Sequence, residues 1–224
     1  MTNEQIDDLI NQFNTGSGDA VIIPSALTPK VAMAQVWLPD IGTCIQDAAD
    51  RFFFVKANGD DYVGSVQDGG VSDLHVYLKD EYRGCSILSA ALNDVIFPWL
   101  AQKDGRSEQR LTFQEPKVKR HFAGRLGFRS TGPLTSRKSL RSYRDRPVEF
   151  MLAPALTATA FTSMKRRLDR ASQLVQMVRA EVESHGLGAE LSKSGMNLQT
   201  VLDYLSGLDD NIRYDAYDAQ GVWV

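Results

Sequence analysis

The sequence predicts a mixed α/β fold, in which a central sheet is flanked by helices and followed by a helical C-terminal extension. Three observations indicate this fold. Apolar and polar residues alternate on both sides of Asn58-Gly59, a pattern typical of a β-hairpin. Segments with strand spacing and segments with helical spacing then follow one another as far as about residue 152. Beyond Pro154 the apolar residues recur at helical spacing alone.

The first 50 residues predict one helix, one strand and two short helical stretches. Four apolar residues near the N-terminus recur at helical spacing: Ile6, Leu9, Ile10 and Phe13. Residues 14–18 then form a flexible joint, and the β-branched run at 20–23 predicts a strand that Pro24 ends. Between residues 29 and 50 we expect two short helices, divided at 39–42.

The middle of the chain predicts strands and helices in succession. The hairpin strands cover residues 51–56 and 62–67. After them we expect a strand at 72–78, a helix at 86–100, a strand at 110–114, a helix at 117–126 and a last strand at 147–152. Residues 131–146 are interpreted as a long connection rich in Ser and Arg, either a binding element or a solvated loop.

The chain divides into three parts in this interpretation. Residues 1–18 form an N-terminal docking helix with its linker, residues 19–154 form the α/β domain, and residues 155–224 form the extension. A helical stripe runs from Phe161 to Val182 in the extension, and a second helix is expected near 198–205. We expect a protein partner, or a second copy of the chain, to dock through the terminal segments.

Composition and hydropathy exclude several classes of protein. The 224 residues are 43 % hydrophobic and 24 % charged, which is ordinary for a folded domain and argues against general disorder. No apolar run reaches the roughly 18 residues that a membrane helix needs. The acidic N-terminal segment is unlike a signal peptide, so we expect a cytoplasmic protein that does not bind membranes.

Cysteine and histidine are too scattered to predict a metal site. Cys44 and Cys85 lie far apart in the sequence, and so do His75, His121 and His185. The spacing therefore predicts no metal ion and no disulfide framework.

The formal net charge of −3 conceals a basic segment at residues 117–146. It holds ten Lys and Arg residues and one carboxylate, Asp145. Such a segment can bind nucleic acid, the ribose phosphate of CoA or an acidic protein surface. Nucleic acid is the less favoured of these, because the segment contains no known nucleic-acid motif.

A strand, a turn and a helix follow one another between Leu74 and Leu92, and this stretch resembles the acetyl-CoA motif of the GNAT superfamily of N-acyltransferases. In that family the strand splays from its neighbour, and the turn and the helix N-terminus surround the CoA pyrophosphate. The resemblance implies acetyl-CoA as the cofactor. It places seven residues near it: Leu78, Arg83, Gly84, Cys85, Ser86, Ile87 and Leu88. Residues 118–128 likewise resemble the family helix that ends in Leu-Gly-Phe.

The sequence departs from the family pattern where the chemistry takes place. Ser86 and Leu88 stand at the two positions where the family has small residues, and a Leu side chain there could obstruct a phosphate. Ala123 follows Phe122 at the position of the tyrosine that protonates the departing thiolate. Tyr77 or Tyr82 would have to supply that proton instead.

An amine substrate must also lose a proton, and three residues are candidates for the base. Asp73, His75 and Glu81 lie on or beside the strand of the motif. The alternatives are structural: Asp73 at a strand edge, His75 as a hydrogen-bonded packing residue and Glu81 in a solvated turn. Cys85 lies close to a helix N-terminus, a position that can activate a thiol.

Two functions are consistent with these features. The departures favour a GNAT-like protein with impaired or lost catalysis, acting as a binding or structural component of a larger assembly. Family members of this kind occur among bacteriophage proteins, so incorporation into a virion is one expectation. The alternative is an active acetyl-CoA-dependent N-acetyltransferase that acts on a primary amine. The acidic residues Glu181 and Glu183 in the C-terminal stripe argue against a membrane-binding helix.

Overall fold

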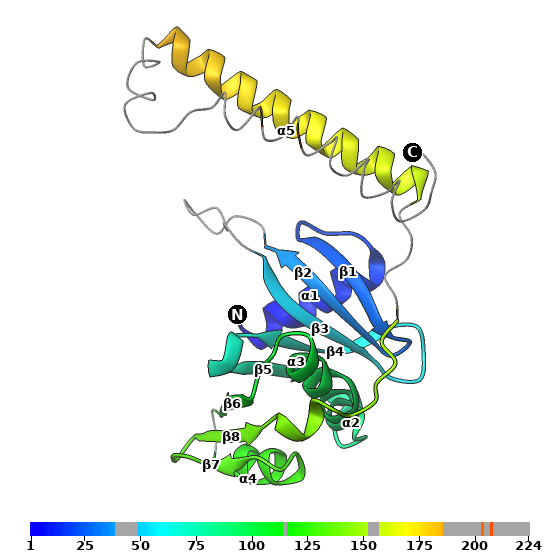
Figure 1. Cartoon of the computed structure of the whole chain (residues 1–224), viewed down its shortest axis with the longest axis vertical. Helices are drawn as coiled ribbons and strands as arrows, with labels where there is room; N and C mark the ends of the chain where they lie inside the picture. The colour runs from blue at the N-terminus through cyan, green and yellow to red at the C-terminus, as the bar shows by residue number, and fades with distance from the viewer. Residues whose placement is uncertain (39–48, 114–115, 152–156, 186–202, 204–206, 208–224) are drawn as a thin grey trace. The chain divides into compact units, whose positions relative to one another are not determined.

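The computed structural model describes residues 1–38, 49–113, 116–151, 157–185, 203 and 207 (Figure 1). The chain divides into two compact units, residues 1–153 and residues 154–224. The first unit contains helices and two antiparallel sheets, so the predicted mixed α/β class is confirmed. In the described part of the chain, no helix has both the length and the apolar character needed to span a bilayer.

The larger sheet is a five-stranded antiparallel meander. Its strands lie in sequence order: β1 (Val21–Thr28), β2 (Val31–Trp37), β3 (Asp50–Lys56), β4 (Tyr62–Asp68) and β5 (Leu74–Leu78). β3 and β4 form the hairpin predicted around Asn58-Gly59. β3 lies at the centre and is buried on both faces from Phe52 to Val55, which explains its continuous apolar run.

Helix α1 (Asn3–Thr15) covers one face of this sheet. Its side chains Ile6, Leu9 and Ile10 pack against Phe52 and Phe54 of β3. A capping box at its start satisfies backbone N–H groups that would otherwise have no acceptor. The predicted N-terminal helix is therefore confirmed, and its apolar side is covered by the sheet of its own chain.

A long helix covers the other face, as Figure 1 shows. It consists of α2 (Ile87–Ala91), the π-helical turn η3 (Leu92–Ile96) and α3 (Phe97–Gln102). Pro98 has no N–H to bond to the carbonyl of residue 94. The N–H of Phe97, the residue before it, donates to the carbonyl of Leu92, five residues back, which is the π-helical pattern. The predicted helix at 86–100 is confirmed with this π turn in its middle.

A second, three-stranded sheet follows. Its strands are β6 (Glu108–Thr112), β7 (Arg129–Ser130) and β8 (Thr135–Ser139), in the order β6-β8-β7. Helix α4 (Pro116–Arg125) connects β6 to β7, close to the predicted bounds. Short 3-10 turns complete the first unit: η1 (Gly70–Ser72), η2 (Asp80–Tyr82) and η4 (Arg141–Tyr143).

Several expected elements are wrong. Residues 31–37 form β2 instead of a helix, because four of them are buried in a sheet whose neighbouring strands supply the hydrogen bonds. Residues 39–48, the rest of that prediction, lie outside the described residues. β1 continues past Pro24 to Thr28, since an edge strand tolerates a residue without an N–H.

The end of the first unit also differs from the prediction. The supposed connection at 131–146 contains β8 and η4, because Ser136 and Leu140 are buried and β6 supplies a partner strand. Residues 147–151 form no strand, and Met151 N–H makes one backbone bond, to Leu27 C=O at 2.9 Å. Leu152 lies outside the described residues.

In the second unit, helix α5 (Ala158–Ser184) contains the predicted stripe and ends near the predicted position. The helix expected near 198–205 falls largely outside the described residues.

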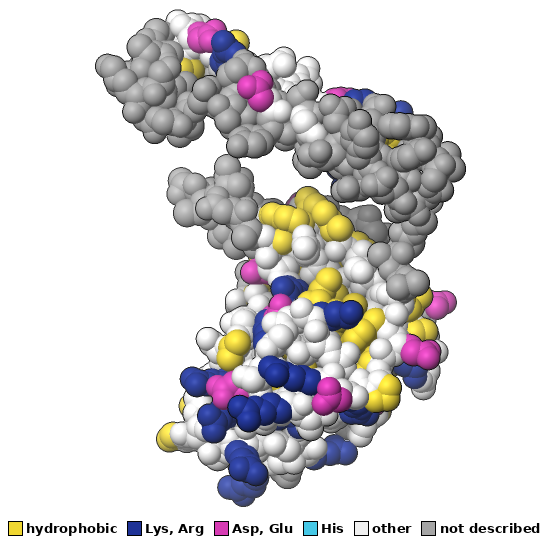
Figure 2. All heavy atoms as spheres, in the orientation of Figure 1, with side chains coloured by type: hydrophobic (Ala, Val, Ile, Leu, Met, Phe, Trp, Pro, Cys, Tyr) yellow, Lys and Arg dark blue, Asp and Glu magenta, His cyan; other side chains and the backbone are white. Residues whose placement is uncertain are grey.

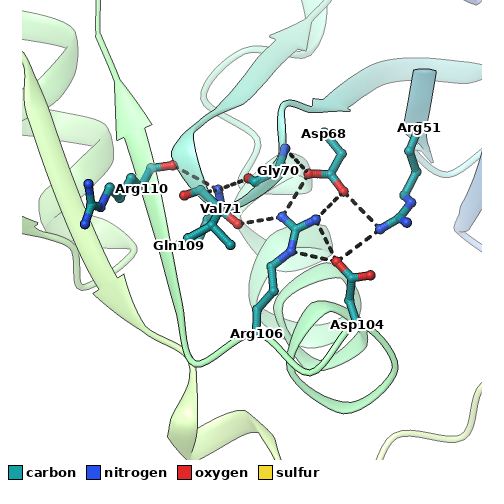
Figure 3. Close-up of polar contacts among 8 residues, drawn as sticks. All are labelled: Arg51, Asp68, Gly70, Val71, Asp104, Arg106, Gln109 and Arg110. Carbon is teal, nitrogen blue, oxygen red and sulfur yellow. Dashed lines mark hydrogen bonds and ion pairs between the residues drawn. The ribbon is translucent and has the colours of Figure 1, made fainter. Parts of the chain in front are cut away.

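A buried polar network joins the two sheets (Figure 3). The guanidinium of Arg106 binds both oxygens of Asp68, at 2.8 and 2.7 Å, and Asp104 at 2.7 Å. The Arg106 and Asp68 side chains are only 8 % and 3 % exposed. Burial lowers the pKa of Arg106, but the two carboxylates outweigh this effect and raise the pKa, so the guanidinium stays charged. Arg51 adds a further ion pair to Asp68 at 3.1 Å.

Side chains, not a backbone ladder, connect β6 to the larger sheet. Gln109 donates to the carbonyl oxygens of Gly70 at 2.8 Å and Val71 at 3.3 Å. The carboxylate of Asp73 accepts from Thr112 N–H at 2.8 Å. Residue 109 thus contacts residues 70–71, and residue 112, further along β6, contacts residue 73. β6 therefore runs in the same direction as η1 and the start of β5.

We expect Arg106→Ala to lower the free energy of unfolding by about 3 kcal/mol, because it leaves the buried carboxylate of Asp68 without its main partner. Urea unfolding measures the change. Arg83→Ala is the control, since the Arg83–Asp80 pair is exposed and is worth about 1 kcal/mol or less. Equal losses in the two variants would contradict a structural role for the network.

Candidate functional site

The outer edge of β5 has backbone groups without a strand partner. Lys79 N–H donates to Val63 C=O at 3.0 Å, and antiparallel pairing alternates from there along β5. The backbone groups of His75 and Tyr77 therefore point to β4, and those of Val76 and Leu78 point away from it. In the described part of the chain, only the Leu78 carbonyl among these outer groups has a partner, the Arg83 Nε at 3.3 Å.

A cavity of about 880 Å³ lies along this edge. Its walls come from β5, from the turn and first residues of α2, from the end of β6 and from α4. Val76 and Leu78 contribute from β5, and Phe113 and Phe122 from the opposite side. The two phenyl rings pack edge to face, with their centroids 6.3 Å apart. The cavity therefore combines an apolar wall with a free strand edge, which suits an elongated ligand that contains amide groups.

The turn at one end of the cavity has an unusual backbone. Gly84 has φ +83°, and Ser86 has φ +59°, the one positive φ of a non-glycine residue in the described chain. The first N–H to bond back into the turn is that of Ala90, to Ser86 C=O at 2.9 Å. The N–H groups of residues 87–89 begin the long helix without an acceptor among the described residues. Such a group of donors binds anions.

Two arginines stand beside this turn. Arg125, in the last turn of α4, donates to the hydroxyl of Ser86 at 3.3 Å and lines the cavity. Arg83 pairs with Asp80 at 2.8 Å, and both side chains are exposed. The turn thus joins free N–H donors with positive charge, which is the chemistry that a phosphate requires.

Six of the seven predicted cofactor residues line the cavity: Leu78, Arg83, Gly84, Ser86, Ile87 and Leu88. The Leu88 side chain is 8 % exposed and packs in the core beneath the turn, so the cavity stays open beside it. Cys85 is an exposed free thiol outside the cavity lining, with its Sγ 3.9 Å from the Arg83 carbonyl oxygen.

Three of the four predicted catalytic residues, Asp73, His75 and Tyr77, have another side-chain contact. Asp73 bonds to Thr112, as described above, and His75 lies 3.2 Å from the Asn3 amide oxygen. Burial lowers the pKa of His75, so its ring is neutral at pH 7. Burial and a 3.1 Å hydrogen bond to Asp7 raise the pKa of Tyr77 to about 12, which makes it a weak acid. Glu81 lies in the exposed turn η2, outside the cavity lining.

Sequence reasoning missed half of the residues that line the cavity, among them Asn3, Phe113 and Arg125. These three come from elements far apart in the chain, so no local spacing could have grouped them. Arg125 was visible only as one member of the basic segment. Ala123, at the position of the missing tyrosine, is 5 % exposed and packs in the core.

Among the described residues, no group of three or more His, Cys, Asp or Glu side chains is placed to hold a metal ion.

We expect Ser86→Gly to raise the free energy of unfolding by about 0.5–1 kcal/mol, because glycine adopts φ +59° without a steric penalty. Thermal unfolding measures this change in the free energy of unfolding. Ser89→Gly is the matched control, and it should lower the free energy of unfolding by about 0.5 kcal/mol, as an ordinary helix substitution does. A loss in both variants would mean that the left-handed backbone at Ser86 carries no strain.

Comparison of this chain with protein-family models, with curated proteins and with solved structures gave no match.

Proposed function

We propose that the first unit is a GNAT-like domain that binds acetyl-CoA in the cavity beside β5, with impaired or lost catalysis. The observation that carries the proposal is the meeting of two features in one cavity. An unpaired strand edge at Val76 and Leu78 leads to the turn that precedes α2, where the N–H groups of residues 87–89 have no acceptor among the described residues.

The arrangement of the sheets supports this proposal. In the GNAT superfamily the strand before the pyrophosphate turn splays from the next strand. Here β5 and β6 belong to different sheets, and side-chain contacts through Gln109 and Asp73 hold them together at one end. The cavity occupies the gap beyond those contacts.

The chemistry of the ligand fits both ends of the cavity. The pantetheine arm of CoA contains two amides, which can pair with the free N–H and C=O of Val76 as an added strand does. The pyrophosphate would lie at the N–H groups of residues 87–89, with the guanidinium of Arg125 beside it.

The same cavity offers little for acid–base chemistry. Phe122 is followed by the buried Ala123, and the hydroxyl of Tyr77 is held by Asp7. Asp73 and His75 are engaged in structural hydrogen bonds. These contacts favour a binding protein over an efficient enzyme. The active N-acetyltransferase stays the second candidate, since the side chain of Leu88 leaves the cavity open.

Calorimetric titration tests the binding. We expect acetyl-CoA to bind with a micromolar dissociation constant, and Arg125→Gln to weaken it about tenfold by removing a charged phosphate contact. Arg141→Gln, at an exposed residue outside the cavity lining, is the matched control. S-acetylpantetheine, which lacks the pyrophosphate, should bind to both variants with the same dissociation constant.

Absence of acetyl-CoA binding to the intact chain would refute this function. Release of CoA thiol in the presence of primary amines would instead support the active transferase. Leu88→Gly is unsuitable as a test of the cavity, because Leu88 packs in the core and its loss would destabilise the unit.

We also propose that α5 mediates assembly with a second copy of the chain. Its stripe repeats in steps of three and four residues: Phe161, Met164, Leu168, Ala171, Val175, Val178 and Val182. Alternating steps of this kind are typical of coiled coils. Leu174, Met177 and Val178 are 47–56 % exposed, which widens the apolar side of the helix.

Sedimentation velocity tests this assembly. We expect the full chain to form oligomers at micromolar concentration, and Leu168→Glu with Val175→Glu to give monomers, because charges in a coiled-coil seam are costly. Arg166→Glu with Gln173→Glu, on the opposite side of α5, should leave the oligomer intact. A monomeric unmodified chain would rule the assembly out.

A further inference from the structure

The three-stranded sheet has one face that is polar throughout. Arg110 of β6 lies directly opposite Arg137 of β8, and Arg137 lies directly opposite Arg129 of β7. Directly opposed residues share a face, so the three guanidiniums form a row across the sheet, the arginine row. All three side chains are exposed. The neighbouring positions on this face carry hydroxyl groups: Thr112, Thr135 and Ser139.

The charge of this face is not balanced. Glu108 is the one carboxylate among its paired residues, and it contacts Arg110 at 3.2 Å and Arg137 at 3.3 Å. Three guanidiniums against one carboxylate leave a net positive face. Like charges directly opposite each other destabilise a sheet, and a bound polyanion removes that repulsion.

The two lysines of the basic segment that lie nearest to this sheet have other contacts. Lys119 donates to Ser130 at 2.6 Å and to the carbonyl of Gly132. Lys138 lies over the rings of Phe97 and Tyr143, at 5.5 and 5.3 Å. Burial lowers the pKa of Lys138, and its ammonium group donates to the carbonyl of Leu126. Figure 2 shows Lys and Arg side chains gathered over the part of the first unit where Figure 1 draws α4, β7 and β8.

We propose that the arginine row binds the phosphate backbone of duplex nucleic acid, independently of sequence. The paired positions of this face contain no apolar or aromatic residue. A protein partner would need apolar area at the centre of its interface, and single strands would need aromatic rings for base stacking. Phosphate contacts need neither, and arginine with hydroxyl neighbours supplies the donors that they use.

The spacing also favours a duplex. Three adjacent strands span about 10 Å, and duplex DNA carries about six phosphate charges over that length of its axis. An acidic protein would have to place several mutually repelling carboxylates within the same distance. The protein's formal net charge is −3, so attraction to DNA has to come from a local face and not from the chain as a whole.

Fluorescence anisotropy with a labelled 20-base-pair duplex tests the proposal on the full chain. We expect a dissociation constant in the micromolar range at 50 mM salt. The logarithm of the affinity should fall with the logarithm of salt concentration with a slope of about −2.7, which corresponds to three phosphate contacts. Substituting all three arginines by Gln should weaken binding at least about tenfold and bring the slope close to zero.

The matched control replaces three exposed arginines of α5 together by Gln: Arg166, Arg167 and Arg170. This control removes the same net charge from another surface. Equal loss of binding in this control would overturn the proposal. So would competition by poly-glutamate as effective, per charge, as that by unlabelled duplex, which would assign the face to an acidic protein.

Glu108→Gln provides a test that misfolding cannot imitate. Removing this carboxylate frees Arg110 and Arg137 and takes away a charge that repels phosphate. We expect about twofold tighter binding of the duplex. Unchanged or weaker binding in a folded Glu108→Gln variant would contradict the role of the arginine row.

Discussion

The first unit depends on the way in which its two sheets are joined. No backbone ladder connects β5 to β6, so the junction rests on a few buried side chains. The guanidinium of Arg106 binds Asp68 and Asp104, and Gln109 reaches the carbonyl oxygens of η1. Buried charges are tolerable here because each one has a partner within hydrogen-bond distance. The junction holds one end of the two strands together and leaves the rest of the β5 edge unpaired.

That unpaired edge connects the fold to the proposed function. A strand with free backbone groups is normally paired or covered, because it invites association with other chains. Here it faces a cavity whose far wall is Phe113 and Phe122 and whose end is the turn before α2. The same separation of the sheets that needs the Arg106 network therefore creates the space for an elongated ligand.

The tertiary structure, more than the order of residues in the sequence, decides what the basic side chains of this protein contact. Residues 117–146 form one basic segment in the sequence, but the fold places their basic side chains in different environments. Arg125 lines the cavity, and Lys138 packs on aromatic rings. Arg129 and Arg137 form the arginine row together with Arg110, which lies outside the basic segment. Alternation along β8 separates Arg137 from Lys138, because neighbouring residues of a strand face opposite sides of the sheet.

The sequence by itself determined the mixed α/β class, the β3–β4 hairpin, α1, α5 and the strand, turn and helix around Arg83-Gly84, because spacing and turn chemistry are local. It did not reveal β2 or β8, whose residues are strands through burial and pairing with distant partners. It named Asp73, His75 and Tyr77 as candidate catalytic groups and left structural roles open for Asp73 and His75. Only the tertiary structure decided that Thr112, Asn3 and Asp7 engage them, since each partner comes from an element remote in the chain.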